Sequence, residues 1–172
     1  MAFNVMVTYV GRAGRENVRF ALDHRRWGLS RIRQSAVLDF PIGLIVSDAK
    51  DPQGRGVSRP SAANWEPMEV TVTITVIGRM GEVEQGDDPF WPNEIADNRI
   101  YYPHRFDLAL IGQIDDIPVG KLPRTLHESI RLRIASGCAD TIRLSPEDLG
   151  FVIESADPAP AAAELVRHLL QE

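Results

Sequence analysis

The feature that most constrains the fold is the segment 68–77, in which threonine at every second position alternates with valine or isoleucine. Alternation with a period of two predicts a β-strand with two unlike faces. The segments 3–10, 42–47 and 105–111 are also rich in β-branched and apolar residues and predict three more strands. We expect all four segments to belong to one curved sheet or barrel.

Helical patterns lie between these strands. Residues 15–25 place apolar side chains on one helical face, and the segment that begins at Pro123 repeats apolar residues every four positions. A further helix start is predicted at Ser145, where a capping serine is followed by proline and two acidic residues. Strands interleaved with helices indicate an α+β fold, a small mixed-strand open β-barrel flanked by helices.

Two long stretches lack either period and are expected to be loops. The segment 49–67 contains three prolines and two glycines, and the second loop extends from about 78 to 100. Long loops in a compact domain are usually functional or disordered, and both of these contain tryptophan, which disordered linkers seldom do. We therefore expect functional residues in these loops.

The length of 172 residues suits one domain over residues 1–156, followed by a proline-rich linker and a short helix at 157–172. No run of apolar residues is long enough to span a membrane, and the N-terminus alternates like a strand rather than a signal peptide. Cys138 is the single cysteine, which excludes an intrachain disulfide. A cytoplasmic protein with no membrane contact is the expectation.

Charge is unevenly distributed along the chain. The net charge is −5, yet residues 12–33 contain seven arginines, whereas residues 82–98 are acidic. A local basic face can contact phosphates on an acidic protein. The candidates for contacts with a nucleic-acid backbone are Arg25, Arg26, Arg31 and Arg33. The alternative is an ordinary solvated surface, because arginine replaces lysine almost throughout this chain.

Catalytic patterns are weak. The sequence has no phosphate-binding Gly-Lys-Ser/Thr loop, its four histidines are scattered, and Cys138 is interpreted as a small packing residue. Asp48 and Lys50 form half of a metal-dependent nuclease site, for which Asp39 or Asp23 would have to supply a second carboxylate. The expectation is a binding protein without catalytic residues, metal or cofactor.

The aromatic residues are more informative. Trp27, Trp91 and Tyr102 lie where the periodic pattern is interrupted, at the entrances of loops. An extruded nucleobase is held by stacking on aromatic faces, and aromatic cages also favour methylated groups. Core packing is the alternative for any single tryptophan. Trp65, in the 49–67 loop, has no assigned role.

The order of these features resembles the EVE and YTH families of PUA-like domains over residues 3–150. Residues 15–29 are similar to the EVE helix that ends in Trp-Gly-Val, and to the YTH helix that ends in a cage tryptophan. Residues 44–47 resemble the YTH strand that ends near a serine, and residues 70–77 fit the barrel strand that follows.

The most similar passage is residues 101–108, which resembles the Tyr-Pro-x-Arg strand of EVE domains and the Arg-Phe-Asp strand of YTH domains. Residues 115–118 resemble the later Asp-Val-Pro segment of YTH domains. By this resemblance Tyr102 takes the position of a cage wall, where YTH domains have tryptophan, and Trp91 is the candidate for the remaining wall.

The resemblance implies a pocket for a methylated or hydroxymethylated cytosine or for N6-methyladenine. The expected function is that of the specificity module of a modification-dependent restriction system, with a nuclease or NTPase as a partner or fused domain. Trp27, Trp91 and Tyr102 would enclose a flipped base, and Ser47 or Asp48 would read its polar edge. DNA is favoured over RNA, a stand-alone binder of modified RNA is the alternative, and a magnesium-dependent nuclease is the third interpretation.

Overall fold

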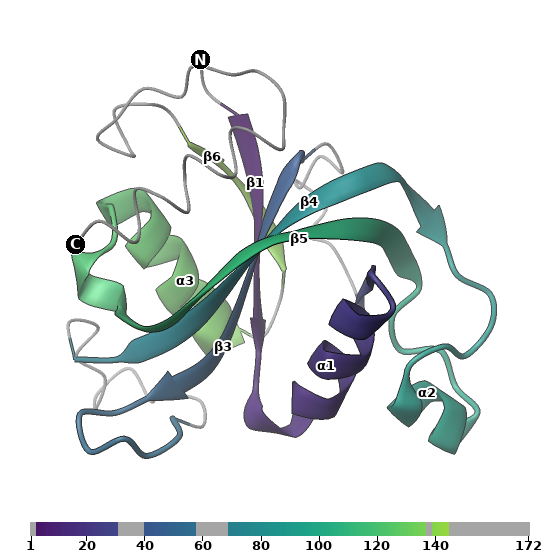
Figure 1. The fold of residues 1–172 in the computed structure, drawn as a ribbon, viewed down its shortest axis with the longest axis horizontal. Helices are drawn as coiled ribbons and strands as arrows, with labels where there is room; N and C mark the ends of the chain where they lie inside the picture. The colour runs from purple at the N-terminus through teal and green to yellow at the C-terminus, as the bar shows by residue number, and fades with distance from the viewer. Residues whose placement is uncertain (1–2, 31–39, 58–68, 137–138, 145–172) are drawn as a thin grey trace.

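A computed structural model describes residues 3–30, 40–57, 69–136 and 139–144. Six strands form one mixed sheet in the order β2-β5-β4-β3-β1-β6, in which β1 and β3 are parallel and the other neighbours are antiparallel (Figure 1). The strands are β1 (Phe3–Val10), β2 (Arg26–Leu29), β3 (Ile42–Lys50), β4 (Thr71–Gln85), β5 (His104–Pro118) and β6 (Asp140–Leu144).

The helices lie on opposite sides of this sheet (Figure 1). They are α1 (Arg15–Asp23), α2 (Pro92–Asp97) and α3 (Arg124–Ser136), with the short 3-10 turns η1 (Arg12–Gly14) and η2 (Val119–Lys121). The strongly curved β4 and β5 bend toward α1 and α2 (Figure 1). The predicted α+β class is confirmed, as are the four predicted strands in one curled, partly open sheet and the helix at 15–25.

The two faces of the sheet have separate cores. Alternate residues of β3 divide between them, since Leu44 packs in the core under α3 and Ile45 packs in the core under α1. Helix α3 contributes Leu126, Ile130 and Ile134 to the first core, which confirms the predicted four-residue spacing. We call the first the aliphatic core and the second the aromatic core, because the second contains the buried rings Trp27, Phe40, Trp91 and Phe106.

The prediction of one loop from 78 to 100 is wrong. Strand β4 continues to Gln85 and pairs with β5 as far as His104, and α2 lies within the rest of the segment. The extension from Met80 onward is mostly exposed, so that its side chains carry no apolar alternation and only the backbone ladder defines the strand. A register shift between Met80 and Glu84, with Gly81 at φ 73°, allows the ladder to continue.

The prediction that Trp27 lies at the entrance of a loop is also wrong. Residues Arg26–Leu29 form the edge strand β2, which pairs Trp27 with Phe106 and Gly28 with Arg105. Four residues with a glycine inside them are too short to show a strand period in the sequence. Trp27 is therefore held by a ladder rather than by a loop.

Some predictions fall outside the described residues. They concern Asp39, Arg31, Arg33, Trp65, Cys138, the helix start at Ser145 and the segment 157–172. None of the helices in the described part of the chain is long and apolar enough to cross a membrane.

Candidate binding pocket

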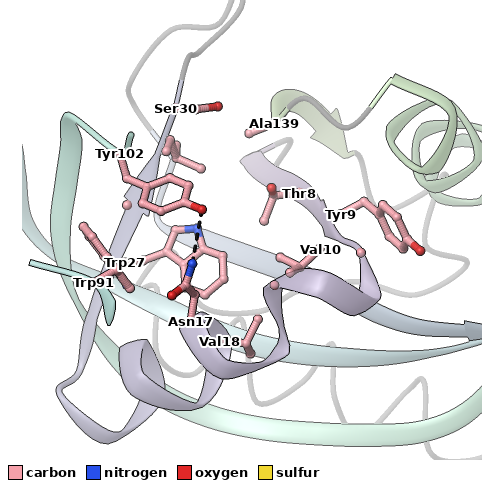
Figure 2. A pocket seen from close by; sticks show the side chains of 14 residues that line it. Thr8, Tyr9, Val10, Asn17, Val18, Trp27, Ser30, Trp91, Tyr102 and Ala139 are labelled. Atoms are coloured by element: carbon pink, nitrogen blue, oxygen red, sulfur yellow. Dashed lines mark hydrogen bonds between the residues drawn. The ribbon is translucent and has the colours of Figure 1, made fainter. Parts of the chain in front are cut away.

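A cavity of about 250 Å³ lies between α1, β2 and the end of β1 (Figure 2). Its lining comes from segments far apart in the sequence, among them the end of β1, α1, β2 and the segment before β5. The lining residues are Thr8, Tyr9, Val10, Gly11, Gly14, Asn17, Val18, Trp27, Gly28, Leu29, Ser30, Trp91, Tyr102 and Ala139.

Three aromatic residues named from the sequence line this one cavity. Trp27 comes from β2, Trp91 immediately precedes α2, and Tyr102 lies two residues before β5. The rings of Trp91 and Tyr102 meet edge to face, with centroids 5.3 Å apart and planes at 74°. Trp27 is only 6% exposed and Trp91 2%, so both also belong to the aromatic core, and Tyr102 is half-buried.

Gly28 makes room for this arrangement. A Cβ atom at position 28 would overlap the Trp91 ring and the Cβ atom of Tyr102. Any larger residue would push Trp91 away from β2. The adjacent Trp27 and Gly28 thus have distinct roles. Trp27 packs in the aromatic core, and Gly28 leaves the space that the Trp91 ring occupies.

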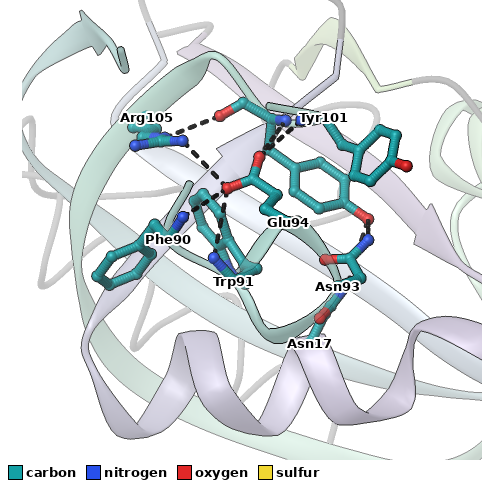
Figure 3. Close-up of polar contacts among 8 residues, drawn as sticks. Asn17, Phe90, Trp91, Asn93, Glu94, Tyr101 and Arg105 are labelled. Atoms are coloured by element: carbon teal, nitrogen blue, oxygen red, sulfur yellow. Dashed lines mark hydrogen bonds and ion pairs between the residues drawn. The ribbon is translucent and has the colours of Figure 1, made fainter. Parts of the chain in front are cut away.

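A buried carboxylate holds the segment that supplies Trp91 and Tyr102 (Figure 3). Glu94 of α2 is 0% exposed, and its Oε2 atom accepts hydrogen bonds from the backbone N–H groups of Phe90 at 2.8 Å and Trp91 at 3.3 Å. Its Oε1 atom accepts from the N–H groups of Tyr101 at 2.8 Å and Tyr102 at 2.7 Å. One side chain thus bonds to both ends of the segment 90–102.

Arg105 completes this polar centre (Figure 3). Its guanidinium lies 3.1 Å from Oε2 of Glu94, donates to the carbonyl of Tyr102 at 2.9 Å, and sits 5.2 Å from the centroid of a Trp91 ring. A Cβ atom at Gly86 would overlap this guanidinium. Burial raises the pKa of the Glu94 carboxyl, but the four backbone N–H groups outweigh burial and hold the pKa below its ordinary value.

The polar side-chain groups of the described lining are neutral: the amide of Asn17, four hydroxyls and the indoles of Trp27 and Trp91. The Tyr102 hydroxyl accepts hydrogen bonds at 3.2 Å from the side-chain amides of Asn17 in α1 and Asn93 in α2. The indole Nε1 of Trp27 is buried and has no hydrogen-bond partner among the described residues. Burial, followed by the charge of Asp48, raises the pKa of Tyr9, which therefore stays neutral.

Ser47 and Asp48, the predicted readers of the base edge, do not line the cavity. Ser47 pairs in the ladder with Val10, and Asp48, at φ 52°, forms an ion pair with Arg15 at the start of α1. The geometry therefore places both beside the cavity wall rather than in it.

Two of the arginines predicted to contact a nucleic-acid backbone lie in the described residues, and they differ in exposure and in ion pairing. Arg25 is exposed, lies at φ 53° and has no ion pair within the described part of the chain. Arg26 is partly buried, lies 3.3 Å from Glu84 and stacks 5.7 Å from the centroid of Phe90. Only Arg25 is therefore ready to meet a phosphate without first losing a partner.

The residues of the proposed nuclease half-site have structural partners. Asp48 pairs with Arg15, and the Lys50 ammonium lies 2.9 Å from Asp116. Asp23 is exposed at the end of α1. Within the described ranges no group of three or more His, Cys, Asp or Glu residues could hold a metal ion.

Sequence reasoning missed Glu94, Asn17 and Asn93. A signal for Glu94 was present, because proline at the first helical position and glutamate at the third mark a helix start after Trp91. The two asparagines meet on the Tyr102 hydroxyl through tertiary packing alone, which no local pattern encodes.

No protein-family model matches this chain, and no curated protein matches it in sequence.

Proposed function

We propose that this chain is a PUA-like reader domain that binds nucleic acid by holding one flipped, modified base in the cavity between Trp27, Trp91 and Tyr102. The observation that carries the proposal is the convergence of three aromatic residues from three separate segments on one cavity. In this proposal the domain binds without catalysing, and it serves as the specificity module of a modification-dependent restriction system.

The size and chemistry of the cavity support a base as the ligand. A cavity of roughly 150 Å³ accommodates a benzene ring, so that about 250 Å³ suits one substituted heterocycle. The described residues that line the cavity include no lysine, arginine, aspartate or glutamate, and therefore a neutral planar group that enters among them leaves none of their charges buried and unpaired. Aromatic walls then contribute roughly 1–3 kcal/mol per stacked base.

The surroundings support contact with a phosphate backbone. Arg19 and Arg25 lie on or just after α1, which borders the cavity, and both are exposed without an ion pair in the described residues. The curled sheet, with α1 packed beside β2, is compatible with the partly open barrel that the resemblance implies. In this mode the arginines bind phosphate irrespective of sequence, and the cavity supplies the preference for one base.

The test is an affinity panel with the wild-type protein. Its probes are DNA duplexes that carry one 5-methylcytosine, one 5-hydroxymethylcytosine, one N6-methyladenine or no modification, together with single-stranded RNA with and without N6-methyladenine. We expect one modified duplex to bind more tightly than its unmodified counterpart. Equal affinity for every probe contradicts the proposal, and a preference confined to RNA selects the stand-alone RNA binder instead.

Removal of a wall gives the second half of the test. Trp27→Ala should lower affinity for the preferred duplex about 5- to 150-fold and leave weak, salt-sensitive binding. Leu108→Ala is the matched control, because Leu108 is buried in the same aromatic core but does not line the cavity. Thermal unfolding of both variants separates a loss of binding from a loss of folding. A folded Trp27→Ala protein that still prefers the modified base contradicts the proposal.

A further inference from the structure

The two aromatic walls that follow β4 are held by different oxygen atoms of one carboxylate. Oε2 of Glu94 accepts the N–H groups of Phe90 and Trp91, and Oε1 accepts those of Tyr101 and Tyr102. Because the two oxygens are fixed to one carbon atom, they fix the distance between the two backbone segments that carry the rings.

We propose that Glu94 is the positioning residue of the pocket, which sets the spacing of the Trp91 and Tyr102 walls before any ligand binds. The role of this spacing in base binding rests on the function proposed above. The spacing itself is a property of the ligand-free protein and can be measured without a ligand. Glu94 does not line the cavity and acts through the backbone of the two wall residues.

The Glu94 side chain makes more contacts than the end of a short helix needs. Helix α2 has six residues, and the bond from Trp91 N–H to Glu94 alone caps its start. The bonds to Tyr101 and Tyr102 reach back from beyond the helix, across Asn98, which has φ 48°. Through Glu94 they connect residues 101–102 to residues 90–91, and the capping of α2 does not require them.

Other contacts fix the rings once the backbone is placed. Trp91 is confined by Gly28 on β2 and by the Arg105 guanidinium, 5.2 Å from its ring centroid. The Tyr102 hydroxyl is tied to Asn17 and Asn93. A pocket whose walls are locked by packing and hydrogen bonds loses little conformational entropy on binding, which raises affinity.

Glu94→Gln tests the proposal, because glutamine keeps the shape of the side chain but only one acceptor oxygen. That oxygen can accept from one pair of N–H groups, and the amide NH₂ must then face the other pair, donor against donor. We expect a crystal structure of the ligand-free variant to show the sheet unchanged and either Trp91 or Tyr102 displaced. Both rings in their wild-type positions would overturn the proposal.

The binding readout is the preference for the modified duplex over the unmodified one in the panel described above. We expect Glu94→Gln to reduce this preference about tenfold, within the range for loss of a stacked ring, with little change for the unmodified duplex. An unchanged preference overturns the positioning role. If the wild-type protein shows no preference, the proposed function fails, and the displacement of the walls still decides the role of Glu94.

Two more variants complete the design. Glu84→Gln is the matched control, since the Glu84 side chain is 71% exposed and, among the described residues, pairs with Arg26 alone, outside the pocket. It should leave both rings and the preference unchanged. Glu94→Asp keeps both oxygens on a shorter side chain and decides the question if the glutamine variant does not fold. We expect it to draw the two walls together or release one, and wild-type wall positions would overturn the proposal.

Discussion

The two faces of the sheet are covered by cores of different composition. Beneath α3 every buried member of the core among the described residues is valine, isoleucine, leucine or alanine, and none of these buried residues lines the candidate pocket. Beneath α1 the core includes four buried aromatic rings, a buried Glu94–Arg105 ion pair and the cavity. The aliphatic face fills its space with apolar side chains, whereas the aromatic face keeps some of its space open.

This difference suggests a division of roles, in which the aliphatic core contributes stability and the aromatic face carries the proposed binding pocket. The buried aliphatic side chains beneath α3 stabilise the fold through their removal from water. On the other face, hydrogen bonds to Glu94 hold the backbone segments that carry Trp91 and Tyr102 beside the cavity. A buried ion pair is weak evidence for stability, so the network at Glu94 is better explained by the shape that it maintains.

The largest expected effect separates the two faces by stability. Leu126→Ala removes a fully buried side chain of α3 from the aliphatic core. It should lower the free energy of unfolding by about 2–5 kcal/mol, from lost burial and the cavity left behind. Chemical denaturation measures this loss. At a temperature where the variant is folded, its preference among the panel duplexes should equal that of the wild type, and a changed preference would show that the faces are coupled.

A smaller effect is expected from Gly28→Ala, on the pocket side. The added methyl group must displace Trp91 or Tyr102, because it would overlap both. Overpacking of this kind costs about 1–3 kcal/mol of stability, and here it should also lower affinity for the modified duplex. Gly78→Ala on β4 is the control, since its added Cβ meets the flexible end of Ile111 at 3.3 Å. Equal binding by both variants would mean that the wall positions do not matter.

The sequence predicts the aliphatic face better than the aromatic one. Strand and helix periods arise where regularly spaced apolar side chains point into one core, as Val70, Val72, Ile74 and Val76 do and as the four-residue repeat of α3 does. The pocket depends instead on tertiary relations, such as Gly28 against Trp91 and the bonds of Glu94 across α2. The three aromatic residues could be named because large rings are conspicuous at interrupted periods. The polar contacts that hold these rings, from Asn17, Asn93 and Glu94, could not be predicted, since polar residues on short helices show no periodic pattern in the sequence.

The smallest effect concerns charge beside the pocket and compares two neighbours, Arg25 and Arg26. Phosphate contacts release counterions, so removal of one contact lowers the slope of log affinity against log salt by about 1. Arg25→Ala should produce this change equally for modified and unmodified duplexes, because Arg25 is exposed and has no ion pair within the described residues. Arg26→Ala should change the slope less, because Glu84 already pairs with its guanidinium.

The Glu84→Gln protein tests this difference between the two arginines directly. Without the carboxylate charge, Arg26 is released from its ion pair and becomes available to phosphate, so the salt slope should become steeper by up to about 1. The surface pair itself contributes only about 0–1 kcal/mol, and therefore the variant should fold normally. The measurement is a series of affinities for the unmodified duplex at increasing salt. A slope equal to that of the wild type would mean that Arg26 faces away from the bound duplex, so that Arg19 and Arg25 mark the side from which the nucleic acid approaches.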